Sequence, residues 1–186
     1  MLESLNTFNR QVFLLFNAPP DANPINIQLA IWLAEHLVVV FFITLAIYLA
    51  WKHRRNKRVC LSVFASILLG ISISYLIRKG FYHPRPFELG LGTNFLEHGT
   101  SSSFPSKHLT AMFSGVLALC FMPATRLFGI FWLPSALSIT WARIYLGVHW
   151  PLDIAGAFAV SLIAASTAYS IVFIENACLK IPFRQA

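Results

Sequence analysis

The sequence predicts an all-α integral membrane protein, built as a helical bundle of five to six transmembrane helices. Hydrophobic residues make up 57% of the 186 residues and charged residues only 11%, whereas about one quarter of a soluble domain is usually charged. The apolar residues form several long runs, and the cationic residues gather in short segments between these runs. Most of the chain is therefore expected to face lipid or other helices.

The formal net charge of +7 does not indicate a nucleic-acid-binding protein, because the positive residues are concentrated in short inter-helix segments and in three clusters. Membrane topology and phosphate binding explain this charge better. The chain shows no internal repeat, low-complexity segment or second domain, so residues 1–186 are expected to form one domain. Its expected surroundings are a membrane bilayer, with no nucleic acid and no evident obligate protein partner.

The N-terminal segment, residues 1–24, is expected to be an interfacial or short helix. Residues 5–17 mix apolar and polar side chains, and Ala18-Pro-Pro-Asp21 ends the pattern. As a helix this stretch reaches only about 20 Å, whereas a bilayer core is about 30 Å thick. An interfacial or re-entrant helix is therefore preferred, with a short true span as the alternative. No basic leader or small-residue cleavage site is evident, so the segment does not resemble a cleaved signal peptide.

Residues 25–174 are expected to form the transmembrane bundle. The first span covers about residues 25–51 and the second about residues 59–77. Five of the seven residues at 52–58 are Lys or Arg, which is the strongest positive-inside signal in the chain and predicts a cytoplasmic loop. Every other segment takes its orientation from this loop.

The second half of the chain supplies three more spans. After a polar external loop at residues 88–103, they cover about residues 109–122, 127–141 and 152–174. Eight of the fourteen Lys and Arg residues then fall on the cytoplasmic side. Because positive charge on the outer face needs a reason, the remaining clusters indicate an anion site. The five cations of these clusters are Arg78, Lys79, Arg85, Lys107 and Arg143.

The arginines of these clusters suit a phosphate group. A guanidinium group binds two phosphate oxygens at once and stays charged at any working pH. Arg85 and Arg143, with Arg78 or Lys79, can therefore neutralise a di-anionic head group. A single arginine at a membrane boundary often only anchors a span, but three at one surface favour phosphate binding.

Two further groups of residues carry chemistry. Ser106 begins the third span beside Lys107 and His108, where its hydroxyl and the exposed backbone N–H groups of a helix N-terminus can hold an anion. His149 and Asp153 lie four residues apart, so a helix that begins between them brings the carboxylate within reach of the imidazole. That contact leaves the other ring nitrogen free to attack phosphorus. A plain N-cap and a structural His–Asp contact are the alternatives.

Metal chemistry is not expected. The chain has six His residues but no His-Glu-x-x-His helix, no Asp cluster and no Cys pair with zinc spacing. His83 and His98 are loop residues without evident partners. The site is therefore expected to use neither a metal nor a cofactor.

One carboxylate is conspicuous inside the first span. Glu35, beside His36, lies about ten residues, or roughly 15 Å, from the outer end of that span. An intramembrane carboxylate indicates a function by default, and shaping the substrate entrance is the role expected here. A carboxylate paired with a neighbouring helix is the alternative of equal weight.

Taken together, the clusters resemble the three-part signature of the type 2 phosphatidic acid phosphatase (PAP2) superfamily, written K-x6-R-P, P-S-G-H and S-R-x5-H-x3-D. The matching residues are Arg85-Pro86, Pro105-Ser-Lys-His108 and Arg143-x5-His149-x3-Asp153, in the same order and spacing. The likeness extends from about Arg78 to the end of the chain.

The sequence departs from this signature at three positions. Arg78 stands in the place of the first Lys, with Lys79 next to it, so the charge is kept. Lys107 replaces Gly and adds a cation, and Ala142 replaces Ser and removes a hydroxyl.

The resemblance implies a metal-free phosphatase. It makes His149 the nucleophile that forms a phosphohistidine, with Asp153 orienting it. It makes His108 the group that protonates the leaving oxygen and then activates water. The phosphoryl oxygens would be held by Arg78 or Lys79, Arg85, Ser106 and Arg143.

Within the superfamily, the small size, the stretch Leu146-Gly-Val-His-Trp-Pro-Leu-Asp153 and the loop Thr93-Asn-Phe-Leu96 are most similar to the small bacterial undecaprenyl-diphosphate phosphatases. Such enzymes remove one phosphate from an isoprenoid lipid carrier and so recycle it for peptidoglycan synthesis. The resemblance therefore implies a polyprenyl-diphosphate lipid substrate and a multi-pass protein of the bacterial inner membrane, with its active site facing the periplasm. Phosphatidylglycerol phosphate, phosphatidate and lipid A are alternative substrates, and a non-catalytic lipid-phosphate carrier is a lower-ranked alternative.

Overall fold

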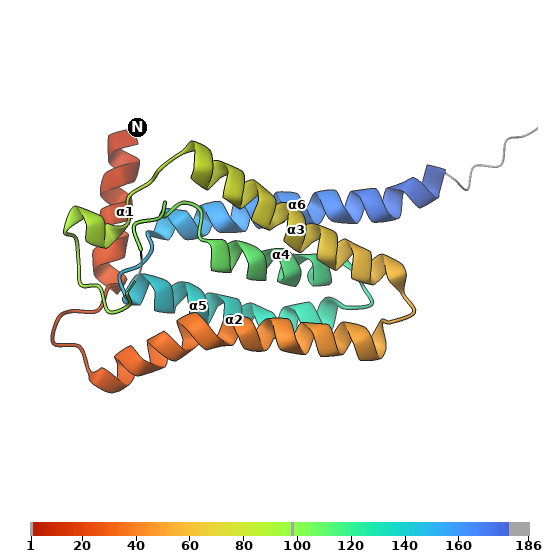
Figure 1. Cartoon of the computed structure of the whole chain (residues 1–186), viewed down its shortest axis with the longest axis horizontal. Coiled ribbons are helices and arrows are strands. Elements are labelled where there is room, and N and C mark those ends of the chain that lie inside the picture. The colour runs from red at the N-terminus through yellow and green to blue at the C-terminus, as the bar shows by residue number, and fades with distance from the viewer. Residues whose placement is uncertain (1, 98, 179–186) are drawn as a thin grey trace, which may run out of the picture.

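The computed structural model describes residues 2–97 and 99–178, and every regular element within them is helical (Figure 1). The prediction of an all-α membrane bundle is confirmed. In chain order the elements are α1 (Leu2–Phe16), α2 (Pro24–Lys52), α3 (Lys57–Gly80), the 3-10 turn η1 (Pro86–Leu89), α4 (Lys107–Phe121), α5 (Arg126–Tyr145) and α6 (Pro151–Cys178).

The long helices begin at local start signals in the sequence. The side chain of Asn23 accepts a hydrogen bond from the backbone N–H of Ile25 at 2.8 Å. Asn56 does the same for Val59 at 3.3 Å. Asparagine at this position satisfies a backbone donor that the helix itself cannot pair. α6 instead begins with Pro151, whose missing N–H costs nothing in the first turn.

Four helices are long and apolar enough to cross a membrane, namely α2, α3, α5 and α6 as far as Phe173. α4 has only 15 residues, or about 22 Å. It packs against α3, α5 and α6, and ten of its residues are buried. A helix enclosed by protein need not match the bilayer, because its polar ends are satisfied by the surrounding chain. The five spans expected from the sequence therefore correspond to α2–α6.

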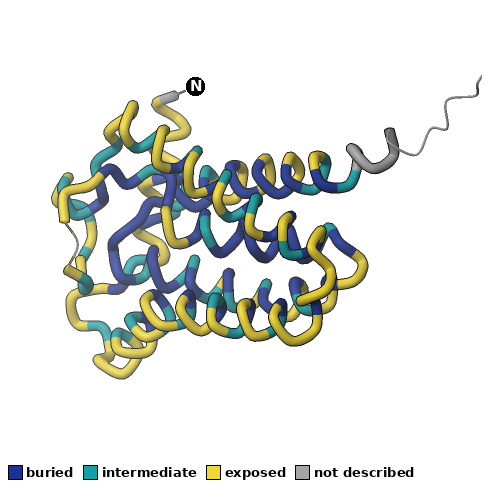
Figure 2. The backbone as a smooth tube through the Cα atoms, turned by 45° about the vertical axis from the view of Figure 1, so that its right-hand side comes forward, coloured by how far each residue is buried: buried dark blue, intermediate teal, exposed yellow. Residues whose placement is uncertain are grey.

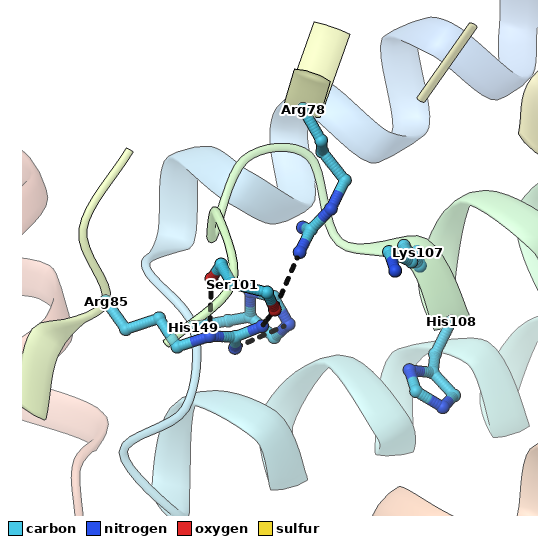
Figure 3. Close-up of a pocket in the computed structure, with 6 residues that line it drawn as sticks. All are labelled: Arg78, Arg85, Ser101, Lys107, His108 and His149. Atoms are coloured by element: carbon cyan, nitrogen blue, oxygen red, sulfur yellow. Dashed lines mark hydrogen bonds between the residues drawn. The ribbon is translucent and has the colours of Figure 1, made fainter. Parts of the chain in front are cut away.

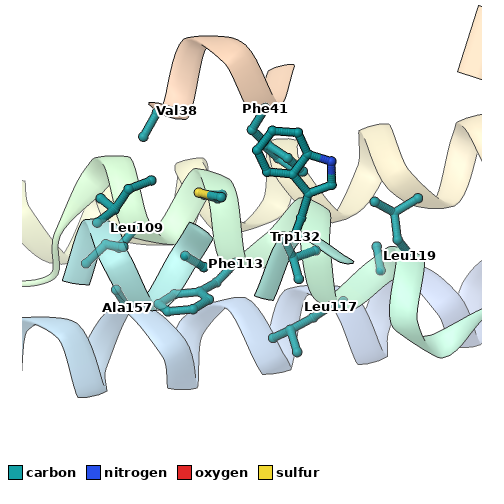
Figure 4. Packing of buried hydrophobic residues seen from close by; sticks show 14 of the residues in the cluster. Val38, Phe41, Leu109, Phe113, Leu117, Leu119, Trp132 and Ala157 are labelled. Atoms are coloured by element: carbon teal, nitrogen blue, oxygen red, sulfur yellow. The ribbon is translucent and has the colours of Figure 1, made fainter. Parts of the chain in front are cut away.

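Apolar side chains occupy both the inside and the outside of the bundle. Phe41, Leu109 and Trp132 pack between the helices, each 5% exposed or less (Figure 4). Ile47 and Phe64 lie on the outside and are 62% and 65% exposed. Exposed residues follow the outer sides of the helices (Figure 2). An apolar outer surface of this extent fits a lipid environment, since it would promote association in water.

Helix α1 runs across the end of the bundle rather than along it (Figure 1). The ring of Phe13 is buried against Trp150, with centroids 5.1 Å apart. The side-chain oxygen of Asn9 accepts a hydrogen bond from the backbone of Leu152 at 3.0 Å. Leu15 on the outer side is 78% exposed. These contacts tie α1 to the start of α6, and the interfacial position of α1 stays a prediction.

Gly147 shapes the turn that leads from α5 to the start of α6. Its φ of +80° lies in the left-handed region, and an added Cβ would overlap the backbone oxygen of Thr93. That oxygen accepts a hydrogen bond from Asn17 at 2.9 Å, so it is held in place. Gly147→Ala is therefore expected to lower the free energy of unfolding by about 2 kcal/mol or more.

The measurement for Gly147→Ala is the thermal unfolding midpoint in detergent, which should fall by roughly 4–8 °C. Gly80→Ala is the matched control, because a Cβ at Gly80 meets nothing within 4 Å and the φ is not positive. Equal midpoints for the two variants would contradict this account of the turn.

Candidate active site

Three loops meet at the end of the bundle that carries α1: the loops before η1, before α4 and before α6 (Figure 1). They surround a cavity of about 100 Å³. Figure 3 shows the residues that line it, which are Arg78, Arg85, Ser101, Lys107, His108 and His149. All but Ser101 are residues that the sequence singled out.

His149 and Asp153 form a buried pair beside this cavity. Because α6 begins at Pro151, Asp153 lies in its first turn and points back to the loop. The Nδ1 atom of His149 is 3.1 Å from the Oδ2 atom of Asp153. The backbone N–H of Trp150 and the hydroxyl of Ser103 donate to the same carboxylate oxygen. The predicted contact between these two residues is therefore present in the structure.

The pair determines which ring nitrogen can react. A carboxylate next to Nδ1 favours the tautomer in which Nδ1 carries the proton, so Nε2 keeps its lone pair. Nε2 lies 3.5 Å from Nη1 of Arg85. His149 is 2% exposed and Asp153 is fully buried, so water competes little for these contacts. The arrangement suits nucleophilic attack by Nε2.

Arg85 is held rigidly at the cavity. It is 3% exposed. Its Nη1 donates to the backbone oxygen of Val148 at 2.8 Å, and its Nε donates to that of Ser101 at 3.1 Å. Burial, and next the nearby Arg78 guanidinium, lower the pKa of Arg85 from its ordinary value. An arginine nevertheless stays charged at neutral pH, so Arg85 presents a fixed positive charge.

Arg78 is fixed by the loop that precedes α4. Its Nη1 donates to the backbone oxygens of Ser103 at 3.1 Å and Pro105 at 3.0 Å. Its Nη2 donates to the hydroxyl of Ser101 at 3.2 Å. Lys79, the alternative, is exposed and is not among the residues that line the cavity. Of the two neighbouring cations, Arg78 is the one in position to meet an anion there.

The serine loop at residues 101–103 is the part of the site that the sequence did not reveal. The Ser101 hydroxyl is also 3.4 Å from Nη2 of Arg85, so it joins the two arginines. Ser103 contacts Asp153, as described above. The available signal was three consecutive serines directly before Phe104-Pro-Ser-Lys-His108. Nothing in their spacing distinguishes such serines from those of an ordinary polar loop.

His108 and Lys107 approach the cavity from the first turn of α4, across from Arg85 and His149 (Figure 3). Both side chains are exposed. Ser106 precedes them as the N-cap residue and is fully buried. Within the described residues, its hydroxyl has no hydrogen-bond partner. The position is therefore open for Ser106 to donate to an anion.

Five predicted residues are not in the lining of the cavity, namely Glu35, Lys79, Ser106, Arg143 and Asp153. Arg143 is 1% exposed, and its Nη2 donates to the backbone oxygen of Ala34 on α2 at 3.0 Å. Among the described residues, its Nε and Nη1 have no acceptor. Glu35, next to Ala34, is exposed on α2. Arg143 is therefore a buried cation between α2 and the site.

His83 has a partner that its sequence position did not reveal. Its Nδ1 lies 3.6 Å from Oδ1 of Asp153, within ion-pair range but longer than a hydrogen bond. The imidazole lies near the aromatic rings of Phe81, Phe104 and Trp150. His83 is a loop residue, as expected, but the loop before η1 folds over the start of α6 and brings the imidazole within ion-pair range of Asp153. His98 lies outside the described residues.

Known proteins with the same pattern identify the family. The model of the PAP2 superfamily matches residues 59–177. The chain belongs to the PAP2 superfamily. Among its relatives, the Escherichia coli (strain K12) protein YbjG is 36% identical over 169 residues, which are 90% of this chain and 83% of that protein. The undecaprenyl-diphosphatase BcrC of Bacillus subtilis (strain 168) is 28% identical over 156 residues, 83% of this chain and 79% of BcrC.

Solved structures show the same PAP2 fold. The crystal structure of Aquifex aeolicus LpxE superposes with a TM-score of 0.69 at 23% identity, covering 85% of this chain and 92% of LpxE. A PAP2-type phosphatidylglycerolphosphate phosphatase from Bacillus subtilis gives a TM-score of 0.61 at 17% identity, covering 98% of this chain and 89% of that one. The family match and the relatives named above make the chain a lipid phosphatase of the PAP2 type. Its membrane-spanning helices make it a multi-pass membrane protein.

Proposed function

We propose that this PAP2 protein hydrolyses undecaprenyl diphosphate to undecaprenyl phosphate and inorganic phosphate. The observation that carries the proposal is the buried His149–Asp153 pair at a cavity lined by Arg78 and Arg85. The names of BcrC and of a second relative, the undecaprenyl-diphosphatase of Sulfolobus acidocaldarius, which is 25% identical over 150 residues, support this substrate. The product would be a carrier lipid ready for another round of peptidoglycan synthesis.

The reaction proceeds in two steps on His149. Nε2 attacks the terminal phosphorus, and the bond from that phosphorus to the bridging oxygen breaks. The leaving undecaprenyl phosphate takes up a proton from His108, which lies across the cavity (Figure 3). His108 then removes a proton from water, whose oxygen attacks the phosphohistidine and releases inorganic phosphate. His149 returns to its starting state, so each catalytic group is restored.

The cations supply most of the acceleration in this scheme. Phosphoryl transfer depends mainly on positioning and on electrostatic stabilisation of the equatorial oxygens. Arg78 and Arg85 are already fixed by backbone oxygens, so little reorganisation is needed when charge develops. Ser106 and Arg143 bring further donors that have no acceptor among the described residues. Asp153 stabilises the positive charge that His149 acquires when it is phosphorylated.

The site is proposed to face the periplasm. The three loops that surround the cavity lie at one end of the bundle, and the α2–α3 loop lies at the other (Figure 1). That loop holds five Lys or Arg in seven residues, the composition of a cytoplasmic segment. The charge pattern therefore supports a site at the outer face of the bacterial inner membrane, where a diphosphate carrier lipid would be released after use.

The first test is phosphate release from undecaprenyl diphosphate by the purified protein in detergent, with and without a chelator. One phosphate per lipid is expected, at the same rate in both conditions. The described residues contain no group of three His, Cys, Asp or Glu side chains placed to hold a metal. Loss of activity with the chelator would contradict the metal-free scheme.

The same assay tests the substrate. Phosphatidylglycerol phosphate, phosphatidate and lipid A are offered singly at equal concentration, and kcat/KM is compared with that for undecaprenyl diphosphate. The diphosphate is expected to give the highest value. A higher value for any of the three phosphomonoesters would replace the proposed substrate while keeping the enzyme class.

A further inference from the structure

A second cavity adjoins the phosphate cavity on its membrane side. It has a volume of about 160 Å³ and is lined by Ile71, Ser74, Tyr75 and Lys107. Lys107 lines both cavities. Lys107 therefore stands at the junction between the phosphate cavity and a mostly apolar groove between α3 and α4.

The groove leads from the reacting phosphate toward the interior of the membrane. Arg78, Ser74 and Ile71 follow one another at spacings of four and three residues, so they share one face of α3. The seven residues from Arg78 to Ile71 correspond to about 10 Å along the helix. Ile71 and Tyr75 are 45% and 58% exposed, so the groove is open to lipid along its length.

The phosphate cavity is too small to hold both phosphates of a lipid diphosphate. At about 100 Å³ it is a third of the smallest common ligand pocket, about 300 Å³. It suits a single phosphoryl group. When the terminal phosphate of a lipid diphosphate meets His149, the other phosphate must lie on the side of the lipid chain, at the mouth of the cavity by Lys107.

The polar groups at this junction suit an anion. Among the described lining residues of the two cavities there is no acidic side chain. Ser74 is 1% exposed, and its hydroxyl has no partner within the described residues. Arg78 and Arg85 serve the reacting phosphoryl group, so Lys107 is the cation left for a neighbouring phosphate, with the hydroxyl groups of Ser74 and Tyr75 as further donors.

We propose that Lys107 binds the non-transferred phosphate of a lipid diphosphate, and that the groove along Ile71, Ser74 and Tyr75 receives the first part of the isoprenoid chain. This proposal rests on the proposed function. The non-transferred phosphate is also the leaving group, and it gains negative charge as its bond to the terminal phosphorus breaks. A cation held at that place stabilises the transition state more than the ground state. Lys107 thereby makes the enzyme selective for diphosphates over monophosphates.

The test compares farnesyl diphosphate with farnesyl monophosphate, which share one chain and differ by one phosphate. For Lys107→Gln, kcat/KM is expected to fall about 10- to 100-fold on the diphosphate, as for loss of one charge-assisted hydrogen bond. On the monophosphate the loss should be clearly smaller, because that substrate has no second phosphate for Lys107 to bind, although its phosphoryl group enters a cavity that Lys107 also lines. Lys107→Arg keeps the charge and should keep the preference for the diphosphate.

Lys79→Gln is the matched comparison. It removes the same charge from the same end of the bundle, but Lys79 lines neither cavity. Any general effect of lost positive charge should lower the rates on both substrates equally and leave their ratio unchanged. An equal loss on both substrates with Lys107→Gln, or no loss on either, would overturn the role of Lys107.

A filling substitution tests the groove. Ser74→Phe should lower kcat/KM for the fifteen-carbon diphosphate relative to the five-carbon isopentenyl diphosphate, because only the longer chain extends along α3. An unchanged ratio would overturn the proposed path of the chain. His149→Ala in the same assays separates the proposed mechanism from the proposed substrate recognition. Activity in that variant would reject the mechanism. The ratios of kcat/KM between two substrates, measured for Lys107→Gln and Ser74→Phe, test substrate recognition alone.

Discussion

Replacing His149 by alanine is expected to lower phosphate release by at least about 10⁴-fold, the range seen when a covalent nucleophile is removed. No described residue can take its place. His149 is the imidazole that lines the cavity with a carboxylate directly behind it, at 3.1 Å. His108 lies on the opposite side of the cavity, where it can transfer protons but cannot attack from the same direction (Figure 3).

The measurement is kcat with undecaprenyl diphosphate, together with the thermal unfolding midpoint of each variant. His149→Gln serves as a second variant, because it keeps polarity and much of the volume in a site that is 2% exposed. Both variants should remain folded and inactive. A folded variant that retains more than about one hundredth of the wild-type rate would show that His149 is not the nucleophile.

Asp153→Asn has the second largest expected effect, a loss of about 10³-fold in kcat. The substitution keeps the shape of a side chain that is fully buried. It removes the negative charge next to Nδ1 of His149, and that charge both selects the tautomer and stabilises the phosphorylated imidazolium. The loss should appear in kcat more than in KM, because the charge matters most as the transition state forms.

Asp21→Asn is the control for this charge change, since Asp21 is exposed in the loop between α1 and α2. It should leave kcat unchanged. Equal rates for Asp153→Asn and the wild type would mean that the carboxylate only holds Ser103 and Trp150 in place, which an amide can also do.

Much of the fold could be predicted from the sequence, because the membrane limits the possible elements. The two spans on either side of residues 52–58 match α2 and α3 within a few residues. Their ends carry strong signals, an Asn–Pro start and a dense cluster of cations. The exact role of α4 was harder to predict, because a buried helix need not be as long as the bilayer is thick.

The residues that we propose to react were predictable where their contacts are local. His149 and Asp153 meet because a helix begins between them, and that spacing can be read from the chain. The partners of Asp153 that lie far away in sequence, Ser103 and His83, were not predictable in this way. Their contacts depend on how two long loops cross, and no periodic pattern encodes that crossing.

Arg143 shows the limit of reading roles from a motif. Its position in the signature assigns it to phosphate, and its Nε and Nη1 lack acceptors among the described residues. Its Nη2 nevertheless donates to α2, so it also joins that helix to the site. Phosphate binding by Arg143 therefore stays a prediction, as does a role for Glu35 at the substrate entrance.

The most direct test of the central claim is to trap the phosphoryl group on the enzyme. Wild type, His108→Ala and His149→Ala are mixed with farnesyl diphosphate, quenched within milliseconds at alkaline pH, and analysed by mass spectrometry of the peptide that contains residue 149. An acid-labile phosphoryl group on His149 is expected in the wild type. It should accumulate in His108→Ala, because the base that activates water is missing, and be absent from His149→Ala. A phosphoryl group on another residue would contradict the role of His149 as nucleophile. So would turnover by the wild type if no adduct is found either in the wild type at the earliest times or in His108→Ala.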